Sequence, residues 1–336
     1  MFNLYKIIFF LTTIFGSLIA ISSYSWLSMW MGLEINLLSI IPLLKDKKNL
    51  YPSESALKYF ITQSLASSIL LLAIVLSLNL KEFFLENFQF LSMMMNSALL
   101  TKMGAAPFHA WFPEVMEGLN WMTGLLMLTW QKIAPMILIF YNLNLSLFFF
   151  LIIIFSTILS GILGLNQISL RKILAYSSIN HISWMLASML YSQTIWLIYF
   201  LIYTIITFNI VIIFKEYQIF YLNQLFSSLN SSKLIKFTFI LNFLSLGGLP
   251  PFLGFFPKWL VINNLILNKF YFLSFLLILF TLITLFFYLR ISFSSLMINS
   301  SESLTFLSKK LNFKILFINF LSLVSLLICT LIFNYI

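Results

Sequence analysis

The sequence predicts an all-α polytopic membrane protein, a single membrane domain (1–336) of about eleven transmembrane helices, two of them broken. Of the 336 residues, 61% are hydrophobic and 8% are charged, which is typical of a membrane protein and not of a soluble domain. Two further observations support this fold class: the basic residues gather on one side of the predicted spans, and prolines interrupt two of the apolar runs.

The apolar runs define the spans in order along the chain. The run after Lys6 has no small-residue cleavage site behind it, so we interpret it as a retained helix and not as a signal peptide. The connections are short, and the longest are 217–236 and 292–313. The predicted spans are 4–24, 26–44, 55–79, 88–107, 122–143, 146–165, 173–190, 194–214, 237–268, 271–291 and 314–335.

Charge placement predicts the orientation of these spans. We place the N-terminus on side A of the membrane. The only basic residues of the connections on the opposite side are then Lys81 and Lys269. The positive-inside rule then makes side A the cytoplasm or the mitochondrial matrix, and an odd number of spans places the C-terminus on the other side. The twelve basic residues of side A are Lys6, Lys45, Lys47, Lys48, Arg171, Lys172, Lys215, Lys233, Lys236, Lys309, Lys310 and Lys314.

The fourth and ninth spans are predicted to be broken helices. As one straight helix, 237–268 would be about 48 Å long at 1.5 Å per residue, which exceeds the thickness of the bilayer. It contains the string GGLPP and Pro257, and proline removes a backbone donor and disfavours helix before it. The fourth span ends in a comparable string, GAAPFHAWFP. Broken backbone at membrane depth is tolerated where it packs within protein or lines a wet cavity.

The two breaks also predict an internal repeat. The string PFHAWFP (107–113) matches PFLGFFP (251–257) at an offset of 144 residues. The breaks lie five spans apart, so the second five-helix unit would be inverted relative to the first, as in many transporters. We therefore expect a first repeat at 1–144, a second, inverted repeat at 145–297, and a loop with the last helix at 298–336.

Four ionisable residues stand isolated in apolar runs and suggest a route for protons: Glu34, Lys102, Lys132 and Lys258. A charge at the bilayer centre costs about 2.5–3.5 kcal/mol on insertion scales, so such residues indicate function by default. Glutamate and lysine suit a proton relay because burial brings their titration towards neutral pH. Structural alternatives are a packing hydrogen bond for Glu34, snorkelling for Lys102, and binding of free carbonyls at the helix break for Lys258.

His181 lies in mid-span beside Ser177, Ser178 and Asn180, and it is a further candidate for the relay or for an interhelical hydrogen bond. The chain has one cysteine, Cys329, which excludes an internal disulfide, a Cys-ligated cluster and a cysteine-based zinc site. No Gly-rich phosphate loop follows a strand, so the chain is not expected to bind a dinucleotide. Altogether, no cofactor and no metal are expected on this chain.

Six strings of the sequence, in order, are MGLEINLLSIIPLL, ALKYFITQSLAS, KMGAAPFHAWFPEVMEG, TWQKIAPM, LNQISLRKILAYSSINHISWML and FLSLGGLPPFLGFFPKWLVI. These strings resemble the antiporter-like membrane subunits of mitochondrial NADH:ubiquinone oxidoreductase, respiratory complex I, in an insect-like form. The resemblance is collinear from about Trp26 to Arg290. Members of this family in animals lack three N-terminal helices of the bacterial form, which agrees with eleven spans.

The resemblance implies roles for individual residues. The family's membrane glutamate falls on Glu34, the lysine of its first broken helix on Lys102, its connecting lysine on Lys132, and the lysine of its second broken helix on Lys258. Glu34 and Lys102 would form a switchable pair, and Lys132 would pass the proton through water towards Lys258, with His181 near the route.

The resemblance also implies a setting, the mitochondrial inner membrane, with the N-terminus in the matrix and the C-terminus in the intermembrane space. FMN, iron–sulfur clusters and ubiquinone would belong to other subunits. Expected partners are the neighbouring antiporter-like chain 4, the small chain 4L, accessory subunits and phospholipids such as cardiolipin; no nucleic acid is expected.

Two alternative functions remain open at this point. A free-standing cation/proton antiporter would share the fold and the buried lysines, although sodium exchange would favour more intramembrane carboxylates than Glu34. A scaffold subunit that moves no protons would be easier to build without intramembrane charges.

Overall fold

The computed structural model describes residues 4–46, 49–79, 85–143, 146–229, 233–250 and 252–297. These residues form fourteen α-helices and no strand, apart from one isolated antiparallel bridge between Ser169 and Tyr221. The all-α fold is therefore confirmed. The predicted last span, 314–335, lies outside the described residues.

Seven helical segments of the described residues are long and apolar enough to cross a membrane. Two shorter apolar helices, Leu234–Gly247 and Phe255–Leu267, come from the predicted ninth span. The polytopic membrane class is thereby confirmed. The seven segments are Leu4–Ser22, Trp26–Leu44, Tyr51–Leu78, Trp121–Phe140, Ser146–Leu165, Gln193–Tyr217 and Tyr271–Phe293.

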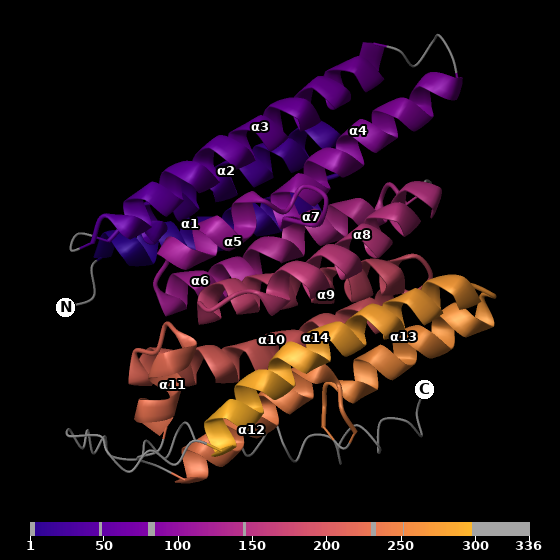
Figure 1. Cartoon of the computed structure of the whole chain (residues 1–336). Helices are drawn as coiled ribbons and strands as arrows, with labels where there is room; N and C mark the ends of the chain where they lie inside the picture. The colour runs from indigo at the N-terminus through magenta and orange to yellow at the C-terminus, as the bar shows by residue number, and fades with distance from the viewer. Residues whose placement is uncertain are drawn as a thin grey trace. The chain divides into compact units, whose positions relative to one another are not determined.

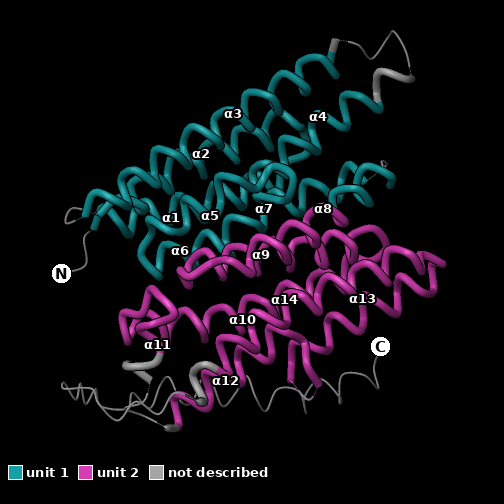
Figure 2. Tube along the Cα trace, in the orientation of Figure 1, with its two compact units in different colours: residues 1–152 teal, residues 153–336 magenta. Residues whose placement is uncertain are grey.

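The chain divides into two compact units, residues 1–152 and 153–336 (Figure 2). In the first unit α3 packs against both α2 and α4, and α7 packs against α4 (Figure 1). The helices of this unit are α1 (Leu4–Ser22), α2 (Trp26–Leu44), α3 (Tyr51–Asn79), α4 (Leu85–Met103), α5 (Trp111–Gly118), α6 (Trp121–Leu128), α7 (Trp130–Phe140) and the first turns of α8 (Ser146–Leu165).

Small residues bring α1 and α2 of the first unit together. A Cβ atom on Gly16 would lie 2.8 Å from the backbone nitrogen of Asn36, and one on Gly32 would lie 2.5 Å from that of Ala20. Since lipid is as apolar as leucine, helices in a membrane associate through such close backbone packing. Gly16 and Gly32 therefore allow α1 and α2 to pack this closely.

The second unit is built around α9 (Leu170–Met189). Apart from Arg171 and Lys172 in its first turn, every residue of this helix is buried, its serines, Asn180 and His181 included. A helix that is buried on all sides forms a core, and α10, α13 and α14 contact it. The other helices of this unit are α10 (Gln193–Tyr217), α11 (Leu222–Leu229), α12 (Lys233–Gly247), α13 (Phe255–Leu267) and α14 (Tyr271–Met297).

Both predicted breaks are present. The first broken helix ends as α4 at Met103 and resumes as α5, and the second ends as α12 at Gly247 and resumes as α13. A glycine with positive φ follows each end, Gly104 at 75° and Gly248 at 77°. This left-handed conformation favours glycine, and it terminates a helix sharply.

The predicted span 122–143 is present as Trp121–Phe140, but it is interrupted: α6 ends at Leu128 and α7 begins at Trp130. The Thr129 hydroxyl donates to the Leu125 carbonyl at 2.8 Å, a bond that bends helices. Two short helices also lie between the longer ones: α5 follows the first break, and α11 lies within the predicted connection 217–236.

Candidate functional site

Glu34 and Lys102 both lie in the first unit, on α2 and in the last turn of α4. Lys102 is buried, with 7% of its surface exposed, so it does not snorkel to the surface of the unit. The charge of half-buried Glu34 acts electrostatically on Lys102. Glu34 and Lys102 are not among the ion pairs within 4.0 Å that the described residues form. The two charges therefore interact over a longer distance in this structure.

A hydrogen-bonded bridge of three side chains, Tyr59, Gln131 and Asn36, joins α3, α7 and α2 next to Lys102. The Tyr59 hydroxyl donates to Gln131 Oε1 at 3.4 Å, and Gln131 Nε2 donates to Asn36 Oδ1 at 2.9 Å. From α3, Gln63 Nε2 donates to the backbone carbonyl of Lys102 at 3.3 Å. These polar groups lie inside an otherwise apolar helix packing.

A small cavity opens between this bridge and Lys102. Its volume is about 10 Å³, roughly the space for the centre of one water molecule. Helices α2, α3, α4 and α7 all contribute to its wall. It is lined by Leu33, Asn36, Leu37, Tyr59, Gln63, Lys102, Gln131 and Pro135.

Lys132 is the most deeply buried of the predicted site residues in the first unit, with 1% of its surface exposed. It lies in the first turn of α7, directly after the interruption at Thr129. Its Nζ lies 5.5 Å from the centre of the Phe112 ring, a distance at which the negative ring face attracts a cation. Pro135 lacks an N–H, so it leaves the carbonyl of Gln131 without its helical donor one turn away.

Lys258 lies in the first turn of α13 and is buried in the second unit, where it binds the end of α12. Its Nζ donates to the carbonyl of Gly247 at 2.9 Å and to that of Leu246 at 3.3 Å. The partial negative charge of a helix C-terminus attracts an ammonium group. The predicted binding of carbonyls at the break is therefore confirmed, and this contact holds the lysine at the interruption of the broken helix.

His181 lies on α9 among the buried tyrosines of the second unit. Its Nδ1 is 2.9 Å from the hydroxyl of Tyr199, and its ring centre is 4.9 Å from that of Tyr203. The neighbouring Asn180 donates to Thr284 Oγ1 of α14 at 3.2 Å. The interhelical hydrogen bond predicted for His181 is thus present, and Asn180 forms a second one.

Sequence reasoning did not identify the bridge residues or the tyrosines around His181. The available signal was weak: Asn36, Gln63 and Gln131 are amides within apolar runs, and polar groups at membrane depth require partners. Tyrosine is ordinary in so aromatic a chain, so nothing in the sequence marks Tyr199. Among the described residues, no group of three or more His, Cys, Asp or Glu side chains could hold a metal ion.

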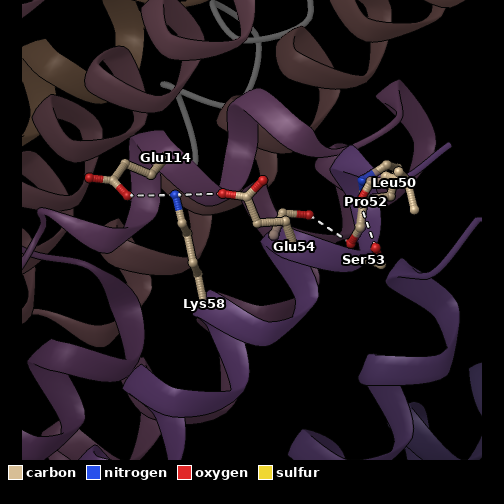
Figure 3. Close-up of polar contacts among 7 residues, drawn as sticks. Leu50, Pro52, Ser53, Glu54, Lys58 and Glu114 are labelled. Atoms are coloured by element: carbon tan, nitrogen blue, oxygen red, sulfur yellow. Dashed lines mark hydrogen bonds and ion pairs between the residues drawn. The ribbon is translucent and has the colours of Figure 1, made fainter.

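An exposed ion pair ties α3 to α5. Lys58 Nζ lies 3.2 Å from Glu54 and 3.1 Å from Glu114 (Figure 3). Glu114 thus lies in the first turn of α5 and pairs with Lys58 of α3. All three side chains are well exposed, and exposed pairs contribute little to stability.

Replacing Lys58 with methionine is expected to leave the free energy of unfolding almost unchanged, because solvent screens both pairs. Thermal unfolding of the purified protein with and without the substitution measures this change. A large loss of stability would mean that the pairs hold α5 in place.

Membrane-spanning helices, broken backbone and buried ammonium groups together define a class: polytopic membrane proteins of transporter type. Comparison with known proteins agrees with this class. Residues 23–284 match the family profile described as NADH:quinone oxidoreductase/Mrp antiporter, TM. The chain belongs to this family.

Individual relatives show which members of the family the chain is similar to. The chain is 53% identical over 332 residues to NADH-ubiquinone oxidoreductase chain 2 of Aedes aegypti, covering 97% of each protein. It is 47% identical to the protein of that name in Locusta migratoria, over 98% of this chain and 96% of the relative. A chain of respiratory complex I from Thermus thermophilus shares the fold with a TM-score of 0.87 at 22% identity, covering 99% of this chain and 80% of that one.

Proposed function

We propose that this chain is an antiporter-like membrane subunit of NADH:ubiquinone oxidoreductase and that it carries protons across the mitochondrial inner membrane. The relatives that share about half of its residues over nearly its whole length bear that enzyme's name. The observation that carries the proton function is the burial of Lys102, Lys132 and Lys258 in apolar helix packing, with 7%, 1% and 7% of their surfaces exposed. Cations at such positions are costly to bury, so their presence in three places indicates a function.

The relay runs through Glu34, Lys102, Lys132 and Lys258, with His181 as an additional member. In the first unit, Glu34 biases the charge on Lys102. Helix α7, which carries Lys132, contributes Gln131 and Pro135 to the wall of the cavity beside Lys102. In the second unit, Lys258 sits where α12 ends, so a small change at the break changes the carbonyls that it can reach. Electron transfer from NADH to ubiquinone on other subunits supplies the driving force.

The proposal includes eleven spans in two inverted repeats with a final helix. Two observations support the repeats: each broken helix ends before a glycine of positive φ, and Gly104 and Gly248 are separated by the 144 residues of the sequence match. The N-terminus would lie in the matrix and the C-terminus in the intermembrane space, as the distribution of basic residues favours.

Within the complex, the neighbours would be chain 4, chain 4L, accessory subunits and phospholipids such as cardiolipin. FMN, iron–sulfur clusters and ubiquinone would bind to other subunits. Apolar side chains are exposed along α1, α3 and α14, as a helix needs them for contact with lipid or with neighbouring membrane subunits.

Extraction of the native membrane in mild detergent tests the assignment. We expect the chain, identified by mass spectrometry, in a large native-gel band that oxidises NADH. If it migrates only as a small, inactive species under conditions that keep complex I whole, a free-standing antiporter is the better account.

A further inference from the structure

The cavity beside Lys102 has the chemistry of a binding site for one water molecule. An ammonium group has three N–H donors and no acceptor. The hydrogen bonds and ion pairs of the described residues include none from Lys102 Nζ, although the side chain is buried and lines the cavity. A buried charge without partners costs much free energy, and a water oxygen in the cavity supplies the acceptor.

A buried water molecule requires two to four hydrogen-bond partners, and the walls of the cavity offer them. Gln63 uses its Nε2 for the Lys102 carbonyl and keeps Oε1, and Asn36 accepts from Gln131 and keeps its amide donors. The apolar part of the wall, Leu33, Leu37 and Pro135, confines the space. The volume of about 10 Å³ admits one water and not a chain of them.

The bridge fixes the shape of this site. Gln131 is its central member, because its oxygen accepts from Tyr59 and its nitrogen donates to Asn36, so both ends of the amide are committed. That commitment orients the amide and holds α2, α3 and α7 around the cavity. Gln131 also directly precedes Lys132, so any change in the bridge acts on the turn of α7 that carries this lysine.

We propose that this cavity binds a single water molecule that accepts a hydrogen bond from Lys102, and that Gln131 is the positioning residue of the site. The inference rests on the proposed function, since the water is the group through which Lys102 exchanges its proton. When the proton leaves, an N–H bond of the ammonium breaks, a new O–H bond forms on the water, and Lys102 becomes a neutral amine. The water in turn releases one of its original protons to the next group of the relay, so it is again a neutral water molecule. The amides hold the water in place and exchange no protons themselves.

The test compares the intact complex carrying Gln131→Leu with the unchanged complex. Leucine has a similar volume but makes neither hydrogen bond of the bridge. We expect normal assembly, a proton-pumping rate about tenfold lower, as for a lost hydrogen bond near a charge, and a larger slowing in D₂O. A purely structural role would lower the amount of complex without changing the solvent isotope effect.

A matched control is Gln167→Leu, because the Gln167 amide donates only to the exposed carbonyl of Leu163 at 3.2 Å. It should leave pumping unchanged. If Gln131→Leu prevents assembly, Tyr59→Phe decides, since it removes one hydroxyl of the bridge and keeps the ring. A smaller fall in pumping with a larger isotope effect supports the proposal, and unchanged values overturn it.

An electron-microscopy map of the intact complex that resolves water gives the direct readout. We expect one density peak in the cavity within hydrogen-bond distance of Lys102 Nζ, and its loss in Gln131→Leu. An empty cavity overturns the inference. If Gln131→Leu pumps normally while Lys132→Met does not, the water site fails and the proposed function stands; if both pump normally, the proposed function fails as well.

Discussion

Replacing Lys132 with methionine is expected to abolish proton transfer through this subunit while leaving the complex assembled. Methionine is close to lysine in length and fits the contact with the Phe112 ring, but it cannot take up a proton. Lys132 is 1% exposed, and removing a buried cation relieves a cost of about 2.5–3.5 kcal/mol at mid-membrane. The variant should therefore be at least as stable as the unchanged protein.

The measurement is the number of protons pumped per NADH oxidised in sealed vesicles, together with the amount of complex on a native gel. Lys58→Met is the matched control, because it makes the same chemical change at an exposed lysine. Full proton stoichiometry in Lys132→Met would contradict the relay and favour a scaffold role for this chain.

Replacing Gly32 with alanine is expected to destabilise the first unit by about 2 kcal/mol through overpacking. The new Cβ would lie 2.5 Å from Ala20 N, 2.8 Å from Ala20 Cα and 2.9 Å from Gly16 O. All three are backbone atoms, so a side-chain rotation cannot relieve the contacts, and α1 must move away from α2. That movement also displaces the α2 turn that carries Glu34 and Asn36.

The control for this substitution is Gly161→Ala. A Cβ there would meet Ile283 Cγ2 at 3.5 Å, an ordinary contact, and alanine favours helix over glycine by about 1 kcal/mol. Pulse-labelling and native gels should show less assembled complex for Gly32→Ala and unchanged or greater amounts for Gly161→Ala. Equal amounts of the two variants would mean that α1 and α2 separate freely.

The sequence predicted those features that depend on local chemistry. Prolines and glycines located the breaks after Met103 and Gly247, because these residues limit the backbone wherever they occur. It did not predict the interruption at Thr129, because threonine is common inside membrane helices and bends them only where its hydroxyl bonds back to a carbonyl. It also treated 122–143 as one helix, since hydropathy reports the length of a span and not its continuity.

The same division holds for the candidate site. Isolation in apolar runs was enough to select Glu34, Lys102, Lys132 and Lys258, because the cost of a charge in a membrane depends on composition and depth, which a sequence carries. Which neutral groups surround them depends on helices that are distant in the chain. Tyr59, Gln131 and Asn36 meet across 95 residues of sequence or fewer, and only the packing of α2, α3 and α7 decides that they enclose a cavity beside Lys102.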